Sequence, residues 1–117
     1  MMLDRTIPFF NTILKCEEYA LRQIILPAAY RIVSDQPGFE RDWARLECSA
    51  GDFENTTNAV DYFCGKYLST DDSADNLLFL LEDTGKVIGS CISWTDDRKG
   101  CPVNSLHWLI IEESCQG

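Results

Sequence analysis

Three β-forming segments in the second half of the chain, joined by short connections, most constrain the fold. They are residues 77–82, 87–95 and 103–111. The first two are joined by four residues, 83–86, with Gly85 where a positive φ is wanted, which predicts a hairpin. The charged residues 96–102 predict a turn before the last strand. Because short connections join antiparallel neighbours, these segments predict an antiparallel meander.

One strand and two helices are expected before this meander. Residues 30–34 are a compact β-forming run and predict the first strand. Residues 39–48 carry apolar side chains at helical spacing, which predicts an amphipathic helix that ends at Gly51. Residues 60–67 carry a second apolar stripe behind N-cap side chains at 55–58, which predicts a second helix. The order predicts an α+β fold: a mainly antiparallel sheet of about four strands with both helices on one face.

The length of 117 residues suits one domain with a hydrophobic core. Residues 1–28 are predicted to be a lead-in segment, and residues 29–117 the folded domain. The lead-in is expected to pack on the domain through Phe9, Phe10 and Ile13.

Charge and cysteine usage exclude several classes of partner. Ten basic and 19 acidic residues give a net charge of −9, which argues against nucleic acid or an anionic membrane as partner. No apolar run approaches the length of about 20 residues that crosses a bilayer, and no secretory signal is visible, so we expect a cytoplasmic location. The six cysteines lack C-x-x-C spacing, and the single His107 cannot complete a tight metal cluster. We therefore expect reduced, mostly buried thiols and no metal site.

Four stretches occur in an order that is typical of one enzyme family. They are 26–31 (Leu-Pro-Ala-Ala-Tyr-Arg), 42–47 (Asp-Trp-Ala-Arg-Leu-Glu), 77–90 with an acidic-Gly turn before Val-Ile-Gly, and 107–117 (His-Trp-Leu-Ile-Ile-Glu-Glu-Ser-Cys-Gln-Gly). They resemble the lead-in to the first strand, the first helix, the hairpin and the fourth strand of the GNAT superfamily of N-acetyltransferases. The resemblance implies the N-terminal half of the GNAT fold, with residues 29–117 as a partial GNAT domain and acetyl-CoA as co-substrate.

The resemblance also implies a set of cofactor-binding residues. Backbone groups of the family's fourth strand pair with the pantetheine arm, and by position these belong to Leu109, Ile110 and Ile111. Gln116 and Gly117 match the first two positions of the family's Gln/Arg-Gly-x-Gly-x-Gly/Ala loop, which holds the pyrophosphate on backbone N–H groups at a helix N-terminus. The resemblance implies that the chain stops at the start of this loop. It would then be inactive in isolation, or active only with a complementing C-terminal half.

Catalysis in this family is direct acyl transfer to an amine, usually aided by a base. His107 has an unperturbed pKa near neutrality and lies on the strand that lines the family's reaction centre. Glu47 on the first helix and Asp96 after the third strand are further candidates for binding a small-molecule or peptide amine. A structural role stays open for each: a packed histidine, or a carboxylate in solvent.

A non-catalytic function stays open as well. The strand at residues 106–111 has a large apolar face and, near a sheet edge, unpaired backbone groups. These features favour a homo-oligomeric binding or assembly module that retains half of the GNAT fold. A chain with no function of its own is a third possibility.

Overall fold

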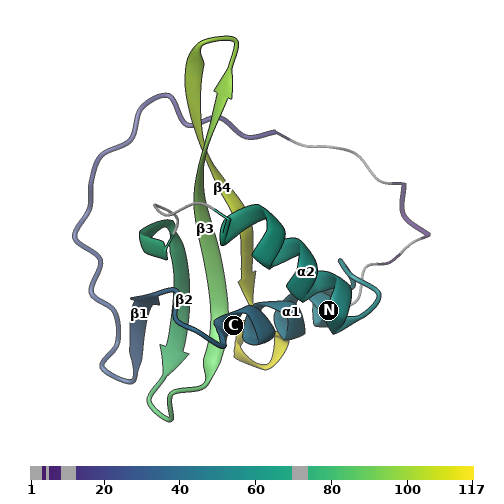
Figure 1. The fold of residues 1–117 in the computed structure, drawn as a ribbon. Coiled ribbons are helices and arrows are strands. Elements are labelled where there is room, and N and C mark those ends of the chain that lie inside the picture. The colour runs from purple at the N-terminus through teal and green to yellow at the C-terminus, as the bar shows by residue number, and fades with distance from the viewer. Residues whose placement is uncertain (1–3, 5, 9–12, 70–73) are drawn as a thin grey trace.

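The computed structural model describes residues 4, 6–8, 13–69 and 74–117. Its main elements are β1 (Tyr30–Ser34), α1 (Phe39–Ala50), α2 (Thr56–Tyr67), β2 (Leu77–Glu82), β3 (Val87–Arg98) and β4 (Cys101–Ile111). Two short 3₁₀ helices, η1 (Ala74–Asn76) and η2 (Glu113–Cys115), precede β2 and follow β4. The four strands form one antiparallel sheet in the order β1-β2-β3-β4 (Figure 1). The predicted α+β fold with a four-stranded antiparallel sheet and two helices is confirmed.

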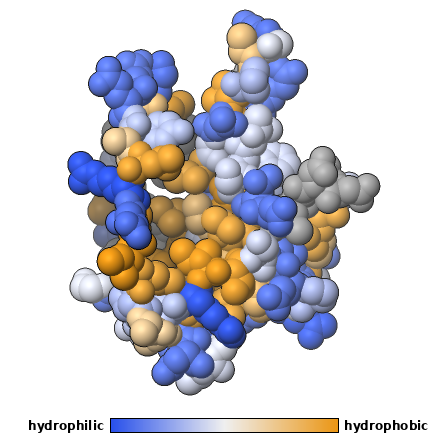
Figure 2. Space-filling view, turned by 90° about the vertical axis from the view of Figure 1, so that its left-hand side faces the viewer, coloured by the Kyte–Doolittle hydropathy of each residue, from blue (hydrophilic) through white to orange (hydrophobic). Residues whose placement is uncertain are grey.

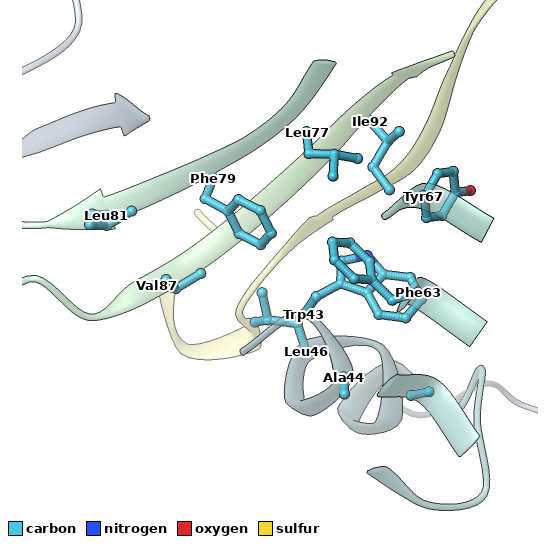
Figure 3. Packing of buried hydrophobic residues seen from close by; sticks show 11 residues of the cluster. Trp43, Ala44, Leu46, Phe63, Tyr67, Leu77, Phe79, Leu81, Val87 and Ile92 are labelled. Carbon is cyan, nitrogen blue, oxygen red and sulfur yellow. The ribbon is translucent and has the colours of Figure 1, made fainter. Parts of the chain in front are cut away.

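Both helices pack on the same face of the sheet, and the core lies between the helices and the sheet. Strand β2 shows why: its side chains alternate across the sheet, so Leu77, Phe79 and Leu81 are buried while Leu78 and Leu80 are only half-buried. Figure 3 shows the buried side chains of the two helices meeting those of the sheet. This core contains Trp43, Ala44, Leu46, Ala59, Phe63, Tyr67, Leu77, Phe79, Leu81, Val87 and Ile92.

The predicted helix ends are confirmed by local hydrogen bonds. Asn55 is the N-cap of α2, where its side-chain oxygen accepts a 2.9 Å hydrogen bond from the backbone N–H of Asn58. Helix α1 ends at Gly51, whose φ of 89° is favourable for glycine and whose N–H donates to the carbonyl of Cys48 at 3.1 Å.

The predicted turn at residues 96–102 is wrong, because β3 and β4 continue through it. They are joined by a two-residue turn, Lys99 and Gly100, with φ values of 54° and 78°. Asp96 therefore lies within β3, opposite Val103, and not after the strand. Figure 1 shows the tip of this hairpin projecting beyond the helices. The charged residues of this tip belong to two strands that extend into solvent. Residue types alone do not distinguish such strands from a turn.

A β-bulge interrupts the pairing of β3 with β4. The register shifts between Ser90 and Ile92: Ser90 lies opposite Ile110. Ile92, however, lies opposite His107, so two residues of β4 face one residue of β3. Trp108, in the bulge, has a φ of 52°, in the left-handed region that a bulky side chain rarely adopts.

The expected packing of the lead-in is wrong at Ile13, whose side chain is 90% exposed. Phe9 and Phe10 lie outside the described residues. Figure 1 shows the described part of the lead-in as an open loop around the sheet. The described residues before β1 form no helix or strand, so their apolar side chains lack the regular spacing that would place them on one side of the segment.

The face of the sheet opposite the helices carries an apolar hollow of about 210 Å³. The lead-in and all four strands line it, and its residues include Leu26, Ile32, Leu78, Leu80, Cys91, Leu109 and Ile111. Figure 2, which looks at the left-hand side of Figure 1, shows hydrophobic residues gathered around a hollow in the lower half of the molecule. One face of the sheet is therefore covered by helices, while the other presents apolar side chains that remain open.

All six cysteines are free thiols. The expectation that most of them are buried is wrong, because three are half-buried and three are exposed. The exposed ones are Cys16, Cys101 and Cys115, which lie in the lead-in, at the start of β4 and in η2.

Candidate functional site

The hydroxyl group of Tyr67 links α2 to the bulge in β4. Its oxygen accepts a 2.9 Å hydrogen bond from Nε1 of Trp108 and lies 3.2 Å from Nδ1 of His107. An indole N–H can only donate, so the single hydroxyl proton of Tyr67 remains available for His107. When Tyr67 donates to Nδ1, the neutral imidazole carries its own proton on Nε2.

The surroundings keep both partners of this hydrogen bond neutral. Burial lowers the pKa of His107, and the positive charge of Lys66 lowers it further, against a weaker opposite effect of Asp96. Burial, followed by the charge of Tyr62, raises the pKa of Tyr67 well above its usual value. At neutral pH the pair is therefore a tyrosine and a neutral imidazole, and a proton taken up by His107 would convert the imidazole to an imidazolium cation.

Aromatic side chains surround this pair. The ring centroid of Trp94 lies 6.2 Å from that of His107 and 5.1 Å from that of Tyr67, the latter in an edge-on arrangement. Nε1 of Trp94 donates a 2.9 Å hydrogen bond to Oδ1 of Asp96. The structure thus brings His107 and Asp96 to one aromatic cluster at the C-terminal end of α2, with Nζ of Lys66 5.7 Å from the Tyr67 ring centroid.

Glu47, the third candidate, is buried and does not lie in solvent. Its side chain is 2% exposed, and burial, followed by the hydrogen bond and charge of Asp52, raises its pKa to about 8. Its Oε1 atom has no hydrogen-bond partner in the described part of the chain. Glu47 is therefore mostly a neutral acid at pH 7, and a neutral acid does not attract an ammonium group as a carboxylate does.

Strand β4 forms one edge of the sheet, and no other strand within the described residues pairs with its outer side. Of the predicted cofactor-binding residues, Ile110 packs against the core, while Leu109 is exposed beside the apolar hollow. Ile111 also lines this hollow, and its carbonyl accepts a 2.8 Å hydrogen bond from Nε2 of Gln116. Gln116 thus lies against the end of β4, while Gly117 lies exposed beyond it.

An ion-pair network fixes the end of β4 to the rest of the fold. Glu112 lies 2.8 Å from Nζ of Lys86 and 3.6 Å from Nη1 of Arg45. Arg45, on α1, also donates a 2.6 Å hydrogen bond from Nη2 to the carbonyl of Val87. The hydrogen bond from Lys86, followed by the charge of Arg45, lowers the pKa of Glu112, so it remains a carboxylate at neutral pH.

The described residues contain neither a metal-binding cluster nor a membrane-spanning helix. In 4, 6–8, 13–69 and 74–117, no three His, Cys, Asp or Glu side chains gather where they could hold a metal ion. No helix formed by these residues has both the length and the apolar character needed to cross a bilayer. No protein-family model matches the chain, and no curated protein matches its sequence.

Proposed function

We propose that the chain forms the strand side of an acetyl-CoA site in a GNAT-type N-acetyltransferase that acts on a small-molecule or peptide amine. The observation that supports this proposal best is the edge of the sheet: β4 has a free outer side in the described structure, and its bulge at Trp108 lies next to His107. A cofactor bound along the strand would end near the one histidine of the chain.

The pantetheine arm of CoA contains two amide groups, and amides can pair with a strand edge as an added β-strand does. The outer side of β4 along Leu109, Ile110 and Ile111 has no strand partner in the described structure, so the backbone groups that point outward there could pair with the arm, in exchange for the Gln116 side chain at the Ile111 carbonyl. The bulge changes the direction in which these groups point on either side of Trp108. This geometry suits a ligand that follows the strand and then turns away at the reacting thioester.

In the proposed reaction the amine nitrogen would attack the thioester carbonyl and form a C–N bond, the C–S bond would break with CoA leaving as the thiolate, and the amine would lose a proton. Neutral His107 is the candidate acceptor of this proton, directly or through water. To accept it at Nε2, the imidazole must carry its other proton on Nδ1. This requires the Tyr67 hydroxyl to turn and accept from His107, which a free hydroxyl rotor permits.

The proposal is tested by NMR titration of the chain with acetyl-CoA. We expect the backbone amides of Leu109, Ile110 and Ile111 to shift, because the pantetheine arm would bind to them. The amides of Tyr30–Ser34 are the internal control, since β1 is the opposite edge of the same sheet. Equal shifts at both edges, or none at millimolar acetyl-CoA, would contradict the proposal.

A second candidate function, a homo-oligomeric assembly module, rests on the exposed apolar residues of β4. The Leu106 and Leu109 side chains are 70% and 72% exposed on this edge strand. Pairing of β4 with β4 of a second copy would cover them and extend the sheet. Light scattering after size-exclusion chromatography should then give a dimer that Leu109→Lys dissociates and Tyr30→Lys, on the other edge, does not. A monomer of 13.3 kDa would contradict this function.

A further inference from the structure

The apolar hollow on the face of the sheet opposite the helices needs a cover. Its side chains Ile32, Leu80 and Ile111 come from β1, β2 and β4, so the hollow crosses the width of the sheet. Ile32 and Leu109 are largely exposed, although both are apolar. An apolar surface of this extent on a folded domain is typical of a binding surface.

The chain places a second exposed apolar surface next to this hollow. The side chains of Leu21, Ile24 and Ile25 are 93%, 86% and 85% exposed. They immediately precede Leu26, which already lines the hollow. The backbone N–H of Tyr30 donates a 3.0 Å hydrogen bond to the carbonyl of Pro27, and this turn fixes the C-terminal end of the segment relative to β1.

The sequence of residues 17–25 has the pattern of a short amphipathic helix. Leu21, Ile24 and Ile25 are spaced i, i+3 and i+4, which places them on one side of a helix. Glu17 and Glu18 would occupy the first turn, where negative charge is favourable. The polar residues 22–23 would face solvent.

We propose that the apolar hollow is the docking groove for the chain's own residues 17–25, which fold into a helix across the sheet. Dimensions support this occupant: strands about 4.8 Å apart place β4 about 14 Å from β1. Nine helical residues that rise about 1.5 Å each also span about 14 Å. A helix that starts from Leu26 beside β1 therefore reaches Leu109 and Ile111 on β4. The proposal does not depend on the acetyltransferase function.

Docking within one chain is favoured over docking onto a second copy. Leu26 holds the C-terminal end of the segment at the groove, so only residues 17–25 have to be ordered. A short tether of this kind keeps the effective concentration of the segment in the millimolar range, above that of a second chain in dilute solution.

Cys91 lines the groove and provides a chemical test. In a Cys16→Ser background, Leu21→Cys on the proposed inner side of the helix should form a disulfide with Cys91 under oxidised glutathione, because five helical residues from Leu26 span about 7.5 Å and bring it over β3. Tyr19→Cys, two residues away on the proposed outer side, is the matched control. Trypsin cleaves after Lys15, Arg22, Lys86 and Arg98, so both variants give the same pair of linked peptides, 16–22 with 87–98.

We expect the intramolecular 21–91 disulfide to form at least tenfold faster than the 19–91 disulfide. Equal rates for the two variants would overturn the proposal, because they would indicate a segment without a preferred side. Absence of the 21–91 disulfide would overturn it as well. A disulfide found only in covalent dimers would show that the groove takes the segment of a second copy, and would overturn docking within the chain.

Discussion

The Tyr67 hydroxyl contacts both His107 and Trp108, yet the sequence predicted Tyr67 only as a member of the apolar stripe of α2. These contacts join residues 40 and 41 positions apart and depend on the bulge in β4. Nothing in the sequence marks that bulge, because its left-handed residue is a tryptophan and not a glycine. Burial of Glu47 was also missed, since a charged residue on a helix is normally in solvent.

At the residue scale, Tyr67→Phe should destabilise the fold by about 1–2 kcal/mol, because the half-buried Trp108 N–H and His107 Nδ1 lose their shared partner. Urea unfolding followed by circular dichroism measures this loss. Tyr30→Phe, at an exposed position on β1 away from this cluster, is the control. Equal losses in both variants would argue against a special role for the Tyr67 hydroxyl.

The buried Glu47 should make the free energy of unfolding depend on pH. The fold raises the pKa of Glu47 from 4.5 to about 8, so the folded state holds this proton more tightly than the unfolded chain. Stability from this group is complete below about pH 4.5 and decreases as the pH rises towards 8. Glu47→Gln keeps the neutral shape and should therefore exceed the wild type in stability by a growing margin, on the order of a few kcal/mol at pH 8.

Urea unfolding between pH 5 and pH 8 measures this difference. Glu54→Gln, which changes an exposed carboxylate, should follow the wild-type pH dependence. A constant difference between Glu47→Gln and the wild type across this range would contradict the assignment of a buried neutral acid.

At the scale of elements, the sequence predicted what local patterns encode. The bounds of β1 and β2, the N-cap at Asn55 and the end of α1 at Gly51 follow from β-forming runs, capping side chains and glycine. The sequence predicted a β3–β4 hairpin that is too short. Asp96 and its charged neighbours are equally compatible with a turn and with strands in solvent. The packing of the two helices on one face agrees with prediction because their apolar stripes leave a single side to bury.

Strand β3 should be sensitive to a side chain at Gly89. A Cβ atom there would lie 2.9 Å from the carbonyl oxygen of Ile110 and 2.5 Å from Cδ1 of Ile111. The carbonyl belongs to the paired strand and cannot move freely, so Gly89→Ala should destabilise the fold by about 1–3 kcal/mol. Gly65→Ala on α2 is the control: its Cβ would meet nothing within 4 Å, and alanine should stabilise the helix by up to about 1 kcal/mol. Thermal unfolding that shifts in the same direction for both variants would contradict this account.

At the scale of the whole molecule, Glu112 joins α1, the β2–β3 hairpin and the end of β4 through Arg45 and Lys86. The pKa of Glu112 is lowered in the fold, so its contribution to stability is present above its ordinary value of 4.5 and is lost as the pH falls through the folded value. Glu112→Gln should cost about 0.5–1 kcal/mol at pH 7 and less at pH 3, where more of the carboxylate is protonated. Urea unfolding at the two pH values measures the change, and an equal cost at both would show that charge is not the cause.

The projecting β3–β4 hairpin has a consequence for how the molecule opens. Water reaches both sides of its tip around Lys99 and Gly100, whereas the same strands are covered by helices near the bulge. Strand separation should therefore start at the tip and peel inwards, with amide hydrogens exchanging first near Gly100 and last near Ile92. The tip of the hairpin should thus open first, as a fraying chain terminus does, although neither terminus of the chain is part of it.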